Sequence, residues 1–381
     1  MTACMLQNGQ ISLKQFTVLV ILATIGDSIL VLPAIPAMEA KQDAWIVAVF
    51  SVIVGSLLGF LYYAVWKRHP DLTLIEYSEE ILGKWLGTVV SLLFLGYCFI
   101  NSAAYLREIG DFLTTNILPQ TPIEAIHIIF LLIVLMGVRL GLESIARTAE
   151  IFFPWAIILV LFLTIALLPQ AHFQNIKPVL EGGVKPILRG SITFIAYPFM
   201  ELVIVLMVLP YVNTDARKKV RNSLVAGMVW GGAVLFLVTT LAILVLGVDF
   251  TTRHLYPSYT LAKKINIGEF IRRFEVVVAI IWFLTIFFKF ILYVYGLSIG
   301  LAQMLRLKEY RALTLPLGMI LIPLSIIISP NIAYLLTVER IYWPLFDATY
   351  SLLLPLLLIC AAALRKKRRK QINDKGEEKK Q

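Results

Sequence analysis

Long apolar runs are the feature of this sequence that most restricts its fold. Runs of about 20 apolar residues, the length that an α-helix needs to cross ~30 Å of hydrocarbon, recur along the whole chain. Of its 381 residues, 59% are hydrophobic and only 15% are charged, and a soluble protein of this size cannot bury so much apolar surface. A transmembrane β-barrel would instead show short segments of alternating polarity. The sequence therefore predicts an all-α integral membrane protein.

Ten of these runs are long enough to cross a membrane as helices. We place them at residues 12–36, 43–66, 85–113, 123–141, 150–168, 187–211, 221–247, 273–300, 312–329 and 341–364. They form a single transmembrane domain over residues 1–364, with half-repeats at about 12–168 and 187–329/364, followed by a basic tail at 365–381. Ten crossings place both termini on one side. We expect that side to be the cytoplasm, because most of the 34 Lys and Arg residues then lie in cytoplasmic segments.

The first span contains residues that an uninterrupted, lipid-facing helix does not tolerate. Gly26, Asp27 and Ser28 lie near its centre, and Pro33 follows in the same run. Glycine lowers helix preference, and proline removes a backbone donor. Unpaired backbone groups at this depth are costly unless protein or a water-filled cavity receives them, and a carboxylate there must face the bundle interior. The sequence predicts a discontinuous helix whose freed N–H and C=O groups face a ligand or water.

A second interruption occurs in the sixth span, where Tyr197, Pro198, Phe199 and Glu201 lie near the midpoint. Spans 1 and 6 begin the two five-span halves, and an odd number of spans per half means that the halves enter the membrane from opposite sides. Paired interruptions at corresponding positions of inverted halves indicate a binding site near the middle of the membrane. The alternative is that each proline makes an ordinary kink, since Pro and Gly are common in transmembrane helices.

One basic residue, Lys289, lies well inside a predicted span. A lysine near a helix end can extend its ammonium group to the membrane surface. Lys289 is past the midpoint of its span but still deep, so we expect it to pair inside the bundle with Glu201 or Asp27.

The third span carries a polar stripe, with Tyr97, Asn101, Tyr105 and Glu108 at intervals of four, four and three. Such a stripe either supplies hydrogen bonds between helices or lines a cavity. Both interpretations remain open for Tyr97 and Asn101, whereas helix packing is expected for Tyr105 and Glu108. Helix packing is also expected for Asp347 in the tenth span.

This layout resembles the amino acid–polyamine–organocation superfamily of transporters, which has a five-plus-five inverted-repeat fold with breaks in helices 1 and 6. Within that superfamily, the chain is similar to the spore germination permease family, the B subunits of GerA-type germinant receptors in endospore-forming bacteria. The similarity covers nearly the whole chain. It rests on Ile-Ser-x-x-Gln at 11–15, Gly-Asp-Ser-Ile-Leu-Val-Leu-Pro at 26–33, the acidic loop at 74–83, Tyr-Pro-Phe-Met-Glu at 197–201 and the short basic tail.

The resemblance implies recognition of a small nutrient, usually an amino acid, in the spore inner membrane, together with a larger A subunit and a lipoprotein C subunit. The candidate ligand-binding residues are Gly26, Asp27, Ser28, Tyr97, Asn101, Tyr197, Phe199, Glu201 and Lys289. Asp27 or Glu201 would bind the ammonium group of the ligand, and freed N–H groups near Gly26 and Ser28 would meet its carboxylate. Tyr197 and Phe199 would shape the side-chain pocket.

Two other functions remain open. The first alternative is a stand-alone secondary amino-acid transporter, and the second is a water or ion conduit of the germination complex, lined by Tyr97, Asn101, Glu201 and Lys289. In sodium-coupled members of the superfamily a cation lies between spans 1 and 8, and a lysine ammonium at that place would repel a sodium ion.

The sequence carries no arrangement typical of an enzyme. It has no phosphate-binding glycine loop and no Ser–His–acid order, and its three cysteines and four histidines lack metal-ligand spacing. We therefore expect no cofactor and no metal. The net charge of +10 comes mostly from the cytoplasmic side, so we expect the basic tail to contact membrane lipid and not nucleic acid.

Overall fold

The structure, a computed structural model, describes residues 9–213, 217–265 and 274–365. Within these residues the chain is helical, apart from loops and one isolated parallel bridge between Ile11 and Val212. Of the predicted basic tail at 365–381, only Arg365 belongs to the described residues.

The described residues contain nine helical stretches that are long and apolar enough to cross a membrane, and ten if the bent pair of α13 and α14 counts as one span. The longer helices are α1 (Leu13–Ile25), α4 (Ala44–Trp66), α6 (Lys84–Asn116), α7 (Ile123–Leu140), α8 (Leu142–Leu167), α9 (Val184–Ile195), α10 (Arg217–Arg253), α12 (Glu275–Met304), α13 (Arg311–Ile327) and α14 (Ile332–Ile341). The shorter ones are α2 (Ser28–Val31), α3 (Ala34–Ala40), α5 (Leu74–Leu82), α11 (Pro257–Lys263) and α15 (Trp343–Ala348), which continues as helix to Arg365. The predicted all-α membrane fold is confirmed.

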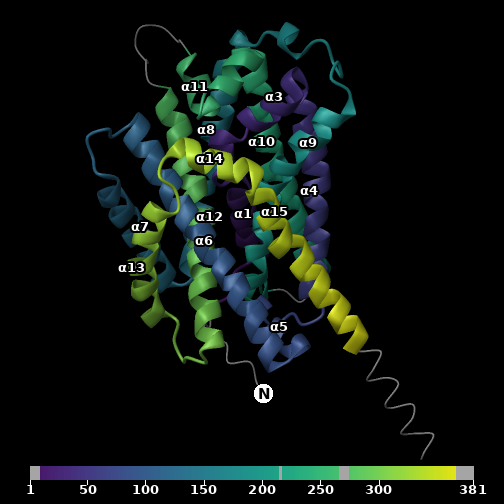
Figure 1. The fold of residues 1–381 in the computed structure, drawn as a ribbon, viewed down its shortest axis with the longest axis vertical. Helices are drawn as coiled ribbons and strands as arrows, with labels where there is room; N and C mark the ends of the chain where they lie inside the picture. The colour runs from purple at the N-terminus through teal and green to yellow at the C-terminus, as the bar shows by residue number, and fades with distance from the viewer. Residues whose placement is uncertain (1–8, 214–216, 266–273, 366–381) are drawn as a thin grey trace, which may run out of the picture.

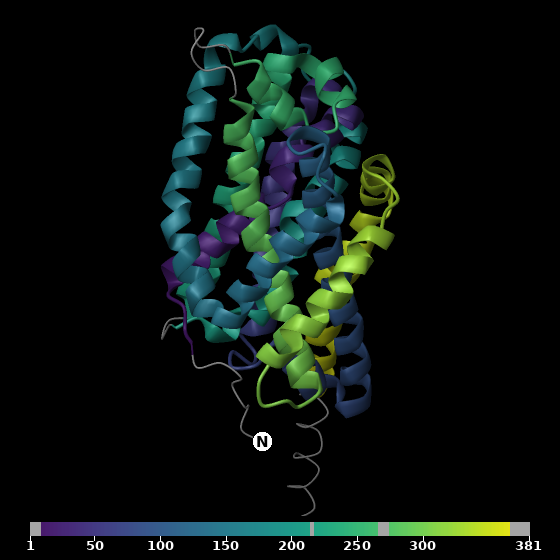
Figure 2. The same ribbon diagram turned by 90° about the vertical axis from the view of Figure 1, so that its left-hand side faces the viewer.

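The two interrupted spans form the centre of the bundle. The apolar window of Leu13–Val31 is 83% buried and that of Val184–Met207 is 89% buried, against 22% for Leu142–Gln170. In Figure 1, α1 lies behind α6 and α12. In Figure 2, α8 runs along the left-hand edge of the molecule, in keeping with the low burial of its apolar window. The segments with broken helices are therefore the ones most shielded from lipid, as the cost of exposed backbone requires.

A capping box starts α1. The Ser12 side chain accepts from Gln15 N at 3.2 Å, and Gln15 Oε1 accepts from Ser12 N at 2.9 Å. Just before it, Ile11 N donates to Tyr211 O at 3.0 Å, and Asn213 N donates to Ile11 O at 2.9 Å. The start of the first span is thereby joined to the end of the sixth.

Small residues let α10 approach α1 closely. A Cβ atom on Gly227 would lie 2.6 Å from Val20 Cγ1, and one on Gly231 would lie 2.5 Å from Thr24 Cβ. In lipid, where burying apolar surface drives helices together only weakly, such close packing is a main source of helix association.

The predicted spans differ from the structure at two places. The helix of the fifth span, α8, begins at Leu142 and not at residue 150. Charged residues in its first two turns lower the local hydropathy without breaking the helix. No span was predicted between residues 329 and 341, where the structure has α14. Glu339 and Arg340 made that segment look like a loop, but α14 bends by 95° from α13 and lies across the bundle (Figure 1).

Candidate functional site

The first span is interrupted at Gly26. Its φ of 39° and ψ of −128° end α1, and the chain resumes as α2. The carbonyl groups released at the break are taken up by α12: Thr285 Oγ1 donates to Gly26 O at 2.8 Å, and Trp282 Nε1 donates to Asp27 O at 3.2 Å. A Cβ atom on Gly26 would lie 2.5 Å from Lys289 Cδ, so the position has no room for a side chain.

The sixth span is interrupted at Pro198. After α9 the chain makes a π-helical turn over Ala196–Met200 and then a 3-10 helix over Glu201–Met207. Proline lacks the N–H that a regular helix would use, and π turns of this kind often occur at functional sites. The hydroxyl of Tyr62 in α4 donates to Met200 O at 3.0 Å and so satisfies one carbonyl of the irregular segment.

Lys289 of α12 joins the two breaks. Its Nζ lies 2.6 Å from Asp27 Oδ1, pairs with Glu201 Oε2 and donates to Tyr197 O at 3.0 Å. The side chains of Lys289, Asp27 and Glu201 are each 1% exposed. We call these three residues the ion-pair cluster. Sequence reasoning expected an interior partner for Lys289, and the structure provides both of the carboxylates that were considered.

The polar stripe of α6 continues from the ion-pair cluster. Tyr105 Oη donates to Glu201 Oε2 at 2.6 Å, and its ring lies 5.3 Å from Lys289 Nζ. Asn101 Nδ2 donates to Tyr97 O at 3.0 Å, and Tyr97 Oη donates to Asp347 Oδ1 at 3.0 Å. Tyr97 and Asn101 therefore make hydrogen bonds at their mid-depth positions, while Tyr105 is the member of the stripe that contacts the cluster directly.

The remaining predicted site residues lie as follows. Ser28 Oγ donates to Asp27 Oδ1 at 3.3 Å, and Tyr197 Oη donates to Glu339 Oε2 at 3.4 Å. The ring of Phe199 lies between α4 and α10, where a Cβ atom on Gly55 would lie 2.3 Å from its Cδ2 atom. The structure thus brings Ser28 and Tyr197 to the cluster and places the Phe199 ring in a helix interface.

Sequence reasoning missed several members of this polar region. Tyr105, Glu108 and Asp347 were expected to serve in helix packing, and Glu339 lies between the ninth and tenth predicted spans and was not considered. All four are buried, at 1%, 8%, 0% and 2% exposed respectively. For the three acids among them, the available signal was a carboxyl group in an apolar segment, which already indicates an interior position.

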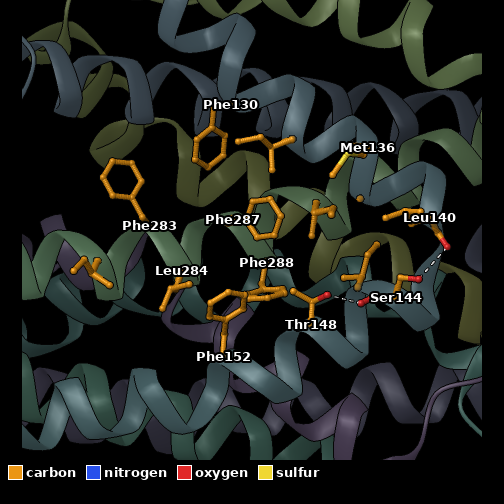
Figure 3. A pocket seen from close by; sticks show the side chains of 15 residues that line it. Phe130, Met136, Leu140, Ser144, Thr148, Phe152, Phe283, Leu284, Phe287 and Phe288 are labelled. Atoms are coloured by element: carbon orange, nitrogen blue, oxygen red, sulfur yellow. Dashed lines mark hydrogen bonds between the residues drawn. The ribbon is translucent and has the colours of Figure 1, made fainter.

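The apolar pocket of Figure 3 is separate from this region. It has a volume of about 470 Å³ and lies between α7, α8 and α12. Its few polar groups are satisfied by nearby backbone, since Ser144 Oγ donates to Leu140 O at the end of α7 at 3.3 Å and Thr148 Oγ1 donates to Ser144 O at 2.8 Å. Met136 on its wall is 61% exposed. The pocket contains no member of the ion-pair cluster, and its apolar lining offers no charged partner for a charged nutrient.

Among the described residues, no group of three or more His, Cys, Asp or Glu side chains is arranged to hold a metal ion. What the cluster can do chemically is bind charge: two carboxylates and one ammonium group, shielded from water, favour a ligand with an ammonium group and an anionic group.

Comparison with known proteins points to germination proteins. A family model described as spore germination protein matches residues 10–333. Spore germination protein KB of Bacillus subtilis (strain 168) is 31% identical over 380 residues, which cover 98% of this chain and 99% of the relative. Spore germination protein YndE of the same strain is 29% identical over 369 residues, covering 94% and 98%. Spore germination protein XB of Bacillus anthracis is 25% identical over 266 residues, covering 68% and 71%.

Two solved transporters have the same fold. The structure of MhsT in complex with L-phenylalanine matches with a TM-score of 0.65 and 12% identity, covering 94% of this chain and 99% of that one. Mhp1, a nucleobase-cation-symport-1 family transporter, matches with a TM-score of 0.61 and 12% identity, covering 90% and 75%. These likenesses confirm the predicted fold class. The relatives and the fold neighbours are germination proteins and transporters, not members of enzyme families.

Proposed function

The chain belongs to the family of spore germination proteins, and from this premise we propose that it is the membrane subunit of a germinant receptor. It binds a small nutrient, an amino acid, at the breaks in spans 1 and 6 and triggers germination together with partner subunits. The relatives support the germination role. The ion-pair cluster is the observation that supports the location of the site, because it places complementary charges where the two breaks meet.

The ammonium group of Lys289 holds the place that an amino-acid ammonium group would take. Asp27 and Glu201 both bind it in this structure. A ligand ammonium group would compete for one of these carboxylates, and its carboxylate would meet the displaced Lys289 or the N–H groups near Gly26 and Ser28. Binding that separates Lys289 from its partners favours one conformation over another, which is what a signalling ligand requires.

We further propose that the protein acts in the spore inner membrane, with A-type and C-type receptor subunits as partners and both termini in the cytoplasm. The charge distribution supports this orientation, because loops rich in Lys and Arg remain in the cytoplasm. The apolar pocket of Figure 3 and the basic tail are contacts for membrane lipid in this proposal.

Neutralising Glu201 tests the location of the site. In spores that carry the chain with its partner subunits, the amino acids that trigger germination are first identified by screening. Glu201→Gln is then expected to raise the germinant concentration for half-maximal response by about 10-fold to 100-fold, because a charged hydrogen bond contributes about 1.5–3 kcal/mol.

The matched control is Glu124→Gln, which removes an exposed carboxylate at the start of α7. It should leave the dose–response unchanged. If Glu201→Gln also leaves it unchanged at normal protein levels, Glu201 does not belong to the site.

A further inference from the structure

Two acidic side chains meet on the half of the bundle remote from the N-terminus. Glu108 of α6 is 8% exposed, and Glu339 of α14 is 2% exposed. Their carboxyl groups are hydrogen-bonded to each other, and Tyr197 Oη donates to Glu339 Oε2 at 3.4 Å. We call Glu108 and Glu339 the carboxyl pair. The function proposed above uses neither of them.

A hydrogen bond between two carboxyl groups restricts their protonation. An ionised carboxylate only accepts hydrogen bonds, so one member of the pair has to carry a proton in order to donate. Two ionised carboxylates in contact would repel each other, and burial makes each charge more costly. In the conformation of this structure, the carboxyl pair therefore binds at least one proton.

The basic groups nearby have other partners. Lys289 pairs with Asp27 and Glu201. Arg107, which precedes Glu108, pairs with Asp111 at 2.8 Å, and Arg340, which follows Glu339, reaches Met38 Sδ at 3.4 Å. From the elements packed against it, the carboxyl pair faces Asp27, Glu201, Lys289, Tyr197 and Tyr256.

Oxygen atoms without donors provide an independent sign of bound protons. Glu201 Oε1 and Asp347 Oδ2 are buried and have no hydrogen-bond partner among the described residues. A buried, ionised oxygen without a donor is expensive. The buried acids of this region also outnumber Lys289, so protons have to neutralise part of their charge.

The carboxyl pair lies where α14 contacts the bundle. α14 bends by 95° from α13 and crosses the upper part of Figure 1. Leu335 and Glu339, four residues apart, share its buried face, whereas Tyr334 is 51% exposed. We propose that Glu108 and Glu339 form a proton-binding site that latches α14 over the ion-pair cluster, and that loss of the proton releases α14.

The direction of the pH dependence follows from linkage. The latched conformation binds a proton that the released conformation, with its carboxylates separated in water, gives up. The conformation that binds more protons is favoured at low pH, so α14 is latched at low pH and released as the pH rises. Buried carboxyl groups can titrate at values up to about pH 8–9. In the orientation proposed above, the carboxyl pair lies toward the outer side of the membrane, so the pH on that side controls its protonation.

Distance measurements on the full chain in lipid nanodiscs test this inference without any germinant. Spin labels are placed on cysteines at Tyr334 of α14 and Phe250 of α10, both of which are about half exposed. Cys4 and Cys360 are replaced by serine, and the buried Cys98 is kept. Between about pH 5 and pH 9 the label distance should change with a single midpoint, and the infrared band of protonated carboxyl groups should decrease with the same midpoint.

The double variant E108Q/E339Q should lose the pH-dependent change in distance, because amide groups hydrogen-bond without titrating. The single variant E339Q should lose it too and show a weaker infrared band. Asp249→Asn, which alters an exposed acid at the end of α10, should behave as the wild type. The inference is overturned if the wild type shows no pH-dependent change, if E108Q/E339Q keeps the wild-type midpoint, or if sodium or potassium ions move the helix at constant pH.

Discussion

The Lys289 side chain connects segments that are far apart in the sequence. It contacts Asp27 in the first span and Glu201 and the Tyr197 carbonyl in the sixth. A buried ion pair adds little net stability compared with apolar packing, because both charges lose their hydration. The charged residues instead depend on one another: when one partner is removed, the others remain buried and unpaired. The ion-pair cluster therefore makes the relative position of the two breaks sensitive to any competing charge.

Replacing the lysine alone should be severely destabilising. Lys289→Met leaves two buried carboxylates without a counter-charge, and we expect the free energy of unfolding to fall by about 3–5 kcal/mol. The combination of Lys289→Met with Asp27→Asn and Glu201→Gln should recover most of this loss, because no charge is then left unpaired. Thermal unfolding of the purified chain in detergent measures both effects.

Lys14→Met is the matched control. Lys14 pairs with Glu150 at 2.7 Å, but its side chain is 77% exposed, so breaking this pair should not change stability measurably. If the triple variant is no more stable than Lys289→Met, the loss comes from packing and not from unpaired charge.

Among the helices, the interrupted ones are held open by their neighbours. α12 supplies Thr285 and Trp282 to the carbonyl groups released at Gly26, and α4 supplies Tyr62 to the sixth span. Backbone groups that a regular helix would pair internally are thus satisfied by side chains, which removes the main cost of breaking a helix within a membrane. The two breaks are thus supported by contacts within the fold itself.

Gly26→Ala tests this arrangement at the level of the helix. Alanine cannot adopt the positive φ without strain, and its Cβ atom would collide with Lys289 Cδ. We expect a loss of at least about 1–2 kcal/mol in the free energy of unfolding. Gly96→Ala is the control, since Gly96 lies in α6 with nothing within 4 Å of an added Cβ atom. Alanine there should be neutral or stabilising. Equal stability of the two variants would contradict a strained break at Gly26.

For the whole molecule, the two functions to distinguish are transport of an amino acid across the membrane and binding of an amino acid as a signal. The likeness to MhsT and Mhp1 shows the fold alone. The position of Lys289 argues against a sodium-coupled cycle, because its ammonium group already supplies positive charge between α1 and α12.

We expect the purified chain in lipid vesicles, without partner subunits, to take up radiolabelled amino acids no faster than protein-free vesicles, with or without a sodium gradient. The spore screen described above supplies the amino acids to use. Rapid uptake in this system would favour the stand-alone transporter over the receptor subunit. Ion or water flux that appears only in the assembled complex would favour the conduit.

Local sequence determined much of this protein. Helices and their approximate bounds follow from apolar runs, since crossing a membrane requires each segment to satisfy its own backbone. The two breaks follow from residues that weaken a helix at mid-depth: Gly26 in the first span and Pro198 in the sixth. The interior position of Lys289 follows from the cost of placing its charge in lipid. Each of these depends on interactions within one segment or between that segment and the bilayer.

Only the tertiary structure decided which polar groups meet. The contact of Glu108 with Glu339 joins two helices that are far apart in the sequence, so the sequence does not predict it. The helix α14 was not predicted, because its charged end resembles a loop. The ring of Phe199 lies between α4 and α10, because Gly55 and Gly232 on those helices leave room for it. A hydropathy pattern predicts that a side chain is buried. Only the packing of the other helices determines which groups it then contacts.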